Sequence, residues 1–499
     1  MSSPHTRHAG VCLHITALPG PYGVGSLGQH ARQFIDQLQA SGVTLWQVLP
    51  TGPTGYGDSP YQLLSVFAGN PMLIDVEHLF ELGLVTRAEL GRLPEGSVHD
   101  VQFGEIVGPR RALLAIAARR FLAQAGAAAH GGFTGYCRAH DAVWLHDFAR
   151  FSVLKSAHGE RPWTEWPAEF ASPDAATLAE VDRRFSLEIQ SIKAQQYLFQ
   201  IQWDRLRGYA QHRGVRLIGD APIYVAHDSA DTWARRDLFQ FDSDQALRAV
   251  GGVPPDYFSA DGQLWGNPLY DWPAHARDEF AWWRDRLARA EALTDILRID
   301  HFRAFEAYWS VPAAATTARD GQWQTGPGDA FLHAVAEHLP DLSILAEDLG
   351  VITPQVQALR QRHGLPGMAV LQFLVDEPGF HPSHIEEDRA CYTGTHDNDT
   401  TRGWFESGDR PEDDARRART LAITQGKAAS VAWDLFCTAL YSQARFAIAP
   451  MQDLLNLPSN SRFNEPGTTE NNWRWRLQPS DFDPTLQASL AAAVAASGR

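Results

Sequence analysis

Four acidic residues of this 499-residue chain each follow a short apolar run: Asp220, Asp300, Glu347 and Asp397. Carboxyl groups act in pairs on acetals, because an ionised one attacks the anomeric carbon while a protonated one gives its proton to the departing oxygen. One acid after an apolar run is common where a strand meets solvent. Four of them in similar settings predict a shared site for nucleophilic and acid–base chemistry at a glycosidic bond.

The candidate nucleophile is Asp300, which lies between Arg298 and Arg303 in the segment RIDHFR. Two guanidinium groups would keep its carboxyl ionised, which is the state that a nucleophile needs. A carboxylate nucleophile forms a covalent glycosyl intermediate and retains the anomeric configuration. The alternative is a structural aspartate–arginine pair at the end of a core strand, and this segment alone does not decide between them.

The candidate acid/base is Glu347. It follows an apolar run and has Asp348 beside it, so we expect loss of solvent and a neighbouring like charge to raise its pKa. Asp397 lies in the segment THDND at residues 395–399. Its carboxylate is placed to bind sugar hydroxyls and to favour a distorted ring.

Two other interpretations of the histidines stay open. His396, Asp397 and Asp399 are possible ligands of a divalent cation. The segment lacks the repeated short-range histidine spacing of a ligand set, so we predict no metal. His396 and His301 are also compatible with satisfied histidines at strand ends.

The elements that would position these residues are eight apolar segments that resemble strands. They cover residues 11–15, 45–50, 215–225, 296–300, 342–348, 368–373, 391–397 and 446–450, with helical patterns such as 31–40 and 355–363 between them. This order predicts a (β/α)8 barrel, in which chemistry occurs at the carboxyl ends of the strands. A doubly wound open sheet is the alternative, although no GxGxxG or Walker-type loop follows any strand.

We expect one elaborated catalytic domain over residues 1–499, with two insertions. Residues 76–195 have helical patterns and form the first, and residues 226–290 form a loop and helix insertion near the site. The second contains a loop at 253–272 that is rich in aromatic and proline residues, including Tyr257. Such a loop could cover an acceptor sugar and exclude water, or simply pack on the barrel.

Composition excludes several classes of function. The net charge of −16 would repel phosphate backbones, so nucleic acid is not an expected partner. No apolar stretch is long enough to cross a membrane, and no leader is apparent. The four cysteines are scattered without ligand or disulfide spacing, which favours a reducing cytoplasm. The 16 tryptophans suit sugar binding but equally suit a large core.

Several motifs together resemble one known family. They are GYGDSPY at 55–61, GDAPIYV at 219–225, VPPDYF at 253–258, GQLWGNP at 262–268, RIDHFR at 298–303, AEDLG at 346–350, GTHDNDT at 394–400 and RFNEPGT at 462–468. In this order, and over nearly the whole chain, they resemble the motifs of 4-α-glucanotransferases. That family, also called amylomaltases or disproportionating enzymes, belongs to the α-amylase clan.

The resemblance implies roles for the matching residues. Asp300 would be the nucleophile, Glu347 the acid/base and Asp397 the stabiliser of the transition state, and no cofactor or metal would be required. The implied sugar contacts are Arg298, which would orient Asp300, His396 and Asp220 at the cleavage point, and Ser59, Tyr61, Gln263, Trp265, Asp376, Asn464 and the more distant Tyr56. The match around Asp376 is the least distinctive.

The residues themselves predict a retaining enzyme that acts on glycosides. The resemblance adds transfer of α-1,4-glucan segments between maltodextrins or amylose, with release of glucose. Two alternatives stay open: an α-glucan hydrolase of the same clan, and a non-catalytic glucan-binding protein. The second would show loss of one of the three carboxylates, and none is lost.

Overall fold

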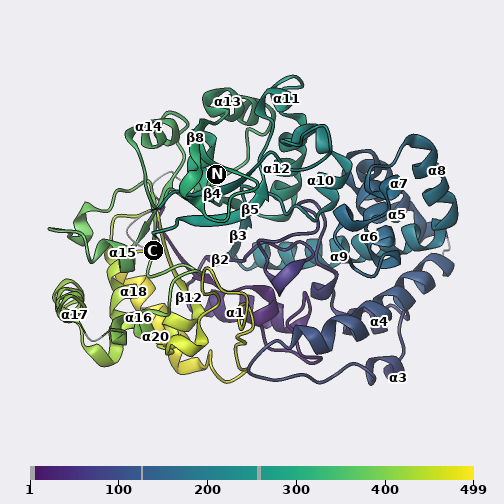
Figure 1. Ribbon diagram of the computed structural model, residues 1–499. Coiled ribbons are helices and arrows are strands. Elements are labelled where there is room, and N and C mark those ends of the chain that lie inside the picture. The colour runs from purple at the N-terminus through teal and green to yellow at the C-terminus, as the bar shows by residue number, and fades with distance from the viewer. Residues whose placement is uncertain (1–5, 125–126, 256–259, 409) are drawn as a thin grey trace.

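Eight parallel strands form the centre of the molecule. The computed structural model describes residues 6–124, 127–255, 260–408 and 410–499. The strands are ordered β10-β11-β12-β1-β2-β3-β6-β9 around a nearly closed barrel (Figure 1). They are β1 (His8–Cys12), β2 (Leu45–Gln47), β3 (Arg216–Ala221), β6 (Ile296–Ile299), β9 (Ile344–Ala346), β10 (Gly367–Val370), β11 (Arg389–Tyr392) and β12 (Phe446–Pro450).

The strand order confirms the predicted barrel. Each strand lies beside its neighbours in the chain order, and β1 pairs with β12, whereas a doubly wound sheet reverses its order at a switch point. One seam, between β9 and β10, has no paired strand residues. There the backbone N–H of Ala346 donates to the carbonyl of Pro366 at 2.8 Å.

Helices cover the outside of the barrel because each has an apolar face. In α1 the buried residues Phe34, Ile35 and Leu38 recur at helical spacing. In α14, Thr353 caps the first turn and Pro354 occupies its first position. Helices between or after the barrel strands include α1 (Gln29–Ala40), α9 (Ser186–His212), α12 (Ala281–Leu293), α13 (Gly328–His338), α14 (Pro354–Arg362), α16 (Thr401–Glu406), α17 (Pro411–Thr424), α18 (Val431–Tyr441) and α20 (Pro484–Ser497).

The segment between β2 and β3 is mainly helical. Figure 1 shows α4 to α8 gathered at one side of the barrel, with α9 leading back to β3. The helices of this segment are α2 (Val76–Glu81), α3 (Arg87–Leu90), α4 (Phe103–Ala123), α5 (Ala127–His140), α6 (His146–Ala157), α7 (Ala168–Ala171) and α8 (Ala175–Arg184). Among the residues that the structure describes, no helix is both long and apolar enough to cross a membrane.

A second sheet includes two strands from residues 226–290, which the sequence predicts to be loop and helix. It is antiparallel, with the order β5-β4-β7-β8, and consists of β4 (Ala249–Val253), β5 (Gln263–Pro268), β7 (Ala307–Pro312) and β8 (Gln322–Thr325). Strand β4 is not predicted from the sequence because it contains Gly251 and Gly252, and glycine is depleted in strands. Both positions need glycine: a Cβ would meet the Tyr224 ring at 2.9 Å from Gly251, and the Gln263 carbonyl at 2.4 Å from Gly252.

Candidate active site

The four predicted acids lie at the same end of the barrel. Asp220 is in the last part of β3, Asp300 directly follows β6, and Glu347 directly follows β9, while Asp397 is in the loop after β11. Parallel strands place their carboxyl ends on one face of a barrel. The separate segments of the sequence are therefore brought together, and side-chain contacts join them.

Arg298 of β6 links two of the acids. Its guanidinium donates to both carboxylate oxygens of Asp220, at 2.8 and 2.7 Å, and forms an ion pair with Asp300 at 3.0 Å. The register of β3 and β6 pairs Asp220 directly with Arg298, so the strands themselves set this contact. The Arg298 side chain is only 4% exposed, and Asp300 retains 27% exposure. One buried cation thus orients an acid that is still open to a ligand.

Arg303 does not have the position expected from the sequence. Its guanidinium lies over the ring of Trp323, 3.9 Å from the centroid, and donates to the carbonyl of Val351. The expectation of two arginines at Asp300 is therefore wrong for this one. The backbone turns sharply after β6, where His301 has a positive φ of 50°, and this turn directs Arg303 away from the carboxylate.

The pKa of Asp300 is raised, to about 6, where the flanking arginines suggested a low value. Burial is the largest cause, and the charges of Asp220 and Asp397 act in the same direction. Arg298 lowers this pKa but does not outweigh burial. The arginine therefore limits the shift rather than reversing it.

Glu347 is held by the backbone. One carboxylate oxygen accepts the N–H of His301 at 2.6 Å, and the other accepts the N–H of Leu349 at 2.9 Å. Burial raises its pKa to about 7, Arg298 opposes this shift, and the charge of Asp300 adds to it. Both pKa values are raised, and that of Glu347 is the higher. This is the order that the expected roles require, because the acid must stay protonated while the nucleophile is ionised.

The like charge near Glu347 is that of Asp300, at the end of the neighbouring strand β6, and not that of its chain neighbour Asp348. The carboxylate of Asp348 points into the seam between β9 and β10, where it accepts the N–H of Met368 at 2.7 Å and pairs with Arg389 at 2.6 Å. The expectation that Asp348 raises the pKa of Glu347 is therefore wrong. Successive residues at a strand end point in opposite directions, which separates their charges.

The contacts of Asp397 favour its ionised form. Asn464 donates to its carboxylate at 2.6 Å, and the ring of His396 lies within 3.4 Å of it. Burial opposes ionisation, but the charge and hydrogen bond of His396 and the bond from Asn464 outweigh it and hold the pKa of Asp397 well below its usual range. Its side chain is 47% exposed, so it can accept hydrogen bonds from a ligand.

Tyr61 joins these groups. Its hydroxyl donates to Asp220 at 2.7 Å, and its ring stacks on His396 with centroids 4.9 Å apart. Trp473 packs against both rings at 5.9 and 6.0 Å. Trp473 could not be predicted from the sequence, because nothing local distinguishes it from the other tryptophans.

The contacts of three further predicted residues lie close to this group. Trp265 of β5 packs edge-on against the ring of His301 at 4.8 Å, and its Nε1 donates to Gln263 at 3.1 Å. Ser59 accepts the backbone N–H of Tyr61 at 3.2 Å. These residues form a polar and aromatic surround for the carboxylates.

Asp376 is differently engaged, because its carboxylate pairs with Arg419 of α17. Among the described residues, no hydrogen bond or ion pair joins Asp376 to the three carboxylates. Tyr257 lies outside the described residues, and the side chain of Tyr56 is outside the described part as well.

A polar pocket of about 470 Å³ adjoins Asp397. It is lined by residues from Ser459 to Asn472, mostly hydroxyls, amides and carboxylates. Arg462 from this lining donates to the backbone carbonyl of Asp397 at 3.1 Å. Its motif was evident in the sequence, but the contact with Asp397 was not.

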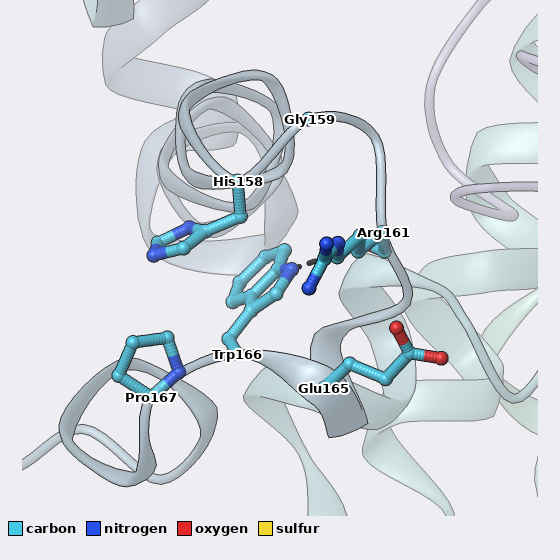
Figure 2. A pocket seen from close by; sticks show the side chains of 6 residues that line it. All are labelled: His158, Gly159, Arg161, Glu165, Trp166 and Pro167. Carbon is cyan, nitrogen blue, oxygen red and sulfur yellow. Dashed lines mark hydrogen bonds between the residues drawn. The ribbon is translucent and has the colours of Figure 1, made fainter.

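A second pocket, of about 700 Å³, lies in the helical segment between β2 and β3. Figure 2 shows His158, Gly159, Arg161, Glu165, Trp166 and Pro167 around it. Trp166 is only 4% exposed, stacks on His158 at 5.3 Å and donates from Nε1 to the carbonyl of Arg161 at 3.0 Å. Its ring is used in packing, so this pocket is not a rival to the carboxylate site.

The three residues considered as possible cation ligands, His396, Asp397 and Asp399, do not form one group. Asp399 accepts the hydroxyl of Ser459 at 2.6 Å, while His396 and Asp397 bond to each other. The described residues contain a different group with ligand atoms close together, Asp329, His333 and His363. The guanidinium of Arg362 donates to both oxygens of Asp329, at 3.2 and 2.8 Å, and its charge opposes a cation there.

Comparison with known proteins gives a consistent result. A family model described as 4-alpha-glucanotransferase matches residues 13–482. A 4-alpha-glucanotransferase of Thermus thermophilus is 44% identical over 503 residues, covering 99% of each chain. The chloroplastic/amyloplastic 4-alpha-glucanotransferase DPE1 of Arabidopsis thaliana is 39% identical and covers 96% of this chain and 83% of that one.

Solved structures agree with these relatives. An amylomaltase from Streptococcus agalactiae, in complex with acarbose, has a TM-score of 0.94 and 34% identity, and the match covers 99% of this chain and 100% of that one. The amylomaltase from Corynebacterium glutamicum has the same fold, with a TM-score of 0.77 and 17% identity.

Proposed function

Because this chain belongs to the 4-alpha-glucanotransferase family and transfers segments of α-1,4-glucan, we propose that it does so by a retaining double displacement at Asp300 and Glu347. The observation that carries this proposal is the pair of carboxyls at one barrel face, Glu347 buried and Asp300 partly exposed, with the pKa of Glu347 above that of Asp300. Near neutral pH this order provides an ionised nucleophile and a protonated acid together.

In the first step the carboxylate of Asp300 attacks the anomeric carbon of the donor glucan. Glu347 protonates the glycosidic oxygen, and the reducing-end fragment leaves. Arg298 orients Asp300 during the attack, because its guanidinium holds one carboxylate oxygen at 3.0 Å. The product is a glycosyl ester of Asp300 and an ionised Glu347.

In the second step a hydroxyl of the acceptor glucan attacks the same carbon. Glu347 now takes its proton as a general base, and Asp300 departs as a carboxylate. Two carboxyls supply the nucleophile, the acid and the base, so this mechanism uses no cofactor. Asp397, ionised and partly exposed, accepts hydrogen bonds from hydroxyls of the reacting sugar.

The sugar-binding surface around these groups fits maltodextrins or amylose as donor and acceptor. Tyr61 and Trp265 are aromatic and can cover the apolar face of a ring, while their hydroxyl and indole N–H meet polar groups. The other proposed contacts are Ser59, Gln263, Asp220, His396, Asn464, Asp376, Tyr56 and Tyr257. One support is that the Streptococcus agalactiae amylomaltase was solved in complex with acarbose.

A cytoplasmic location is part of the proposal. Its support is that all four cysteines, Cys12, Cys137, Cys391 and Cys437, are free thiols, as expected in a reducing compartment. The proposal also includes the domain organisation, in which one catalytic barrel domain carries insertions at 76–195 and 226–290.

The covalent intermediate can be trapped in Glu347→Gln. With α-maltosyl fluoride as donor, fluoride leaves without a proton, so Asp300 is glycosylated, but the missing base slows the second step. Mass spectrometry should find a maltosyl adduct on the peptide that contains Asp300. An adduct elsewhere, or inversion of the product anomer by NMR, would contradict the mechanism.

A further inference from the structure

One seam of the barrel lies directly beside the acid/base. Strands β9 and β10 share the backbone bond between Ala346 and Pro366 but no paired residues. In a regular parallel ladder the next donor, the N–H of Met368, would bind the carbonyl of Ala346. Here it donates to the carboxylate of Asp348 at 2.7 Å. A side chain therefore takes the place of a rung of the ladder.

The rest of the Asp348 carboxylate is held by two arginines. Arg389 of β11 pairs with it at 2.6 Å, and Arg360 of α14 pairs with it at 3.2 Å. Arg360 also pairs with Asp388 at 2.7 Å. The Asp348 side chain is only 2% exposed, so this network is buried at its centre.

The fold makes room for this carboxylate. A Cβ at Gly367 would lie 2.5 Å from a carboxylate oxygen of Asp348. Any larger residue there would displace Asp348 or move β10. The close approach of β10 to the end of β9 thus depends on a glycine on one strand and an aspartate on the other.

The backbone around Glu347 is connected to its two neighbouring strands, β6 and β10, in different ways. Toward β6 its backbone is bonded twice, from its N–H to the carbonyl of Ile299 and from the N–H of Phe302 to its carbonyl, both at 3.0 Å. Toward β10 the next residue, Asp348, provides the connection. The peptide that bears Glu347 is therefore fixed between main-chain bonds and a buried ion network.

We propose that Asp348 is a positioning residue that closes the seam between β9 and β10 and so holds Glu347 at the glycosidic oxygen. The inference rests on the proposed role of Glu347 as acid/base. Asp348 itself touches neither the sugar nor the reacting atoms. Loss of its charge frees the end of β9 to shift relative to β6, and displacement of a catalytic group by about 1 Å can lower a rate about 10²-fold.

The test compares two reactions that differ in their need for Glu347. Maltotriose disproportionation needs proton transfer in both steps. With α-maltosyl fluoride as donor and azide as acceptor, fluoride leaves unprotonated, and azide attacks the anomeric carbon without giving up a proton, releasing Asp300 and forming a glycosyl azide. A badly placed acid/base should impair the first reaction and spare the second.

For Asp348→Asn we expect kcat on maltotriose to fall about 10²-fold with KM changed less than about threefold. The rate with the fluoride and azide should fall less than about fivefold. A role in stability alone would lower both reactions by the same factor, and that result overturns the proposal, as does unchanged activity with maltotriose.

Asp388→Asn is the matched control. It also removes a carboxylate from an arginine of this network, but at the end where the Asp388 side chain is 52% exposed. We expect both reactions to stay within about twofold, because Arg360 keeps Asp348 and the carbonyl of Leu365 as partners and solvent already reaches Asp388. A loss as large as that of Asp348→Asn, on maltotriose only, would assign the effect to the network in general and overturn the role of Asp348.

Two further variants keep the test decisive. If Asp348→Asn does not fold, Gly367→Ala provides the test, because it crowds the same carboxylate. It should lower the rate with maltotriose much more than the rate with fluoride and azide, and an equal loss on both reactions overturns the proposal.

Glu347→Gln tests the acid/base role itself. Its rate should fall about 10³-fold with maltotriose and little with fluoride and azide. If it loses both equally, the proposed acid/base role fails, whatever Asp348 does.

Discussion

The two carboxyls proposed to react are held in different ways. Asp300 depends on a side chain, because Arg298 reaches it from its own strand and is shared with Asp220. Glu347 depends on the main chain, through the N–H groups of His301 and Leu349. The first arrangement is sensitive to single substitutions of a charged residue. The second can be disturbed only through the strands that carry the backbone.

Removal of the nucleophile should cause the largest loss of activity. Asp300→Ala should lower glucose release from maltotriose by at least about 10⁴-fold, because no other group can form the glycosyl ester. Product chromatography measures this loss, and circular dichroism should show an unchanged fold. Substantial transfer by the purified variant would refute the assignment of Asp300.

Removal of the shared cation tests the side-chain arrangement itself. Arg298→Met should lower kcat/KM about 10²- to 10³-fold, the usual effect of losing one aligned charged donor. Arg298 lowers the pKa of both carboxyls, so its loss should move both limbs of the pH profile to higher pH. Steady-state kinetics against pH measures both effects.

Arg303→Met is the control for that experiment. Arg303 flanks Asp300 in the sequence but contacts Trp323 and Val351, so we expect less than about a tenfold change and no shift of the limbs. Equal effects of the two variants would mean that Arg298 has no special relation to Asp300.

The pH dependence compares the two carboxyls in the intact protein. Asp300 must be ionised, so kcat/KM should fall below its pKa of about 6, and Glu347 must be protonated, so kcat/KM should fall above its pKa of about 7. We expect a narrow bell with its maximum between these values and about a tenfold loss for each further unit. A flat profile from pH 5 to 9, within about twofold, would contradict the proposed protonation states.

The smallest expected effect concerns the support of Asp220. Tyr61→Phe keeps the ring on His396 and removes only the hydroxyl that donates to Asp220. One net hydrogen bond of about 1 kcal/mol corresponds to roughly a fivefold loss in kcat/KM. Tyr61→Ala, which also removes the stacking, should lose clearly more, and equal losses would show that the ring contributes nothing.

Much of the barrel and of the carboxylate set could be predicted from the sequence. The eight barrel strands are short apolar runs with turns after them, which is a local property, and the acids lie at the ends of these runs or in the loop that follows. Strand β4 of the second sheet was not predicted, because it contains two glycines that the close approach of Tyr224 and β5 requires. Such a requirement comes from another part of the chain.

The sequence by itself determined which acids are present and that barrel closure would bring them together. The tertiary structure decided which neighbours act on them. Arg298 reaches Asp300 while Arg303 turns away, and Asp348 enters a seam instead of facing Glu347. The physical reason is that charge interactions depend on direction and burial over a few ångströms, and adjacent residues at a strand end point to different sides.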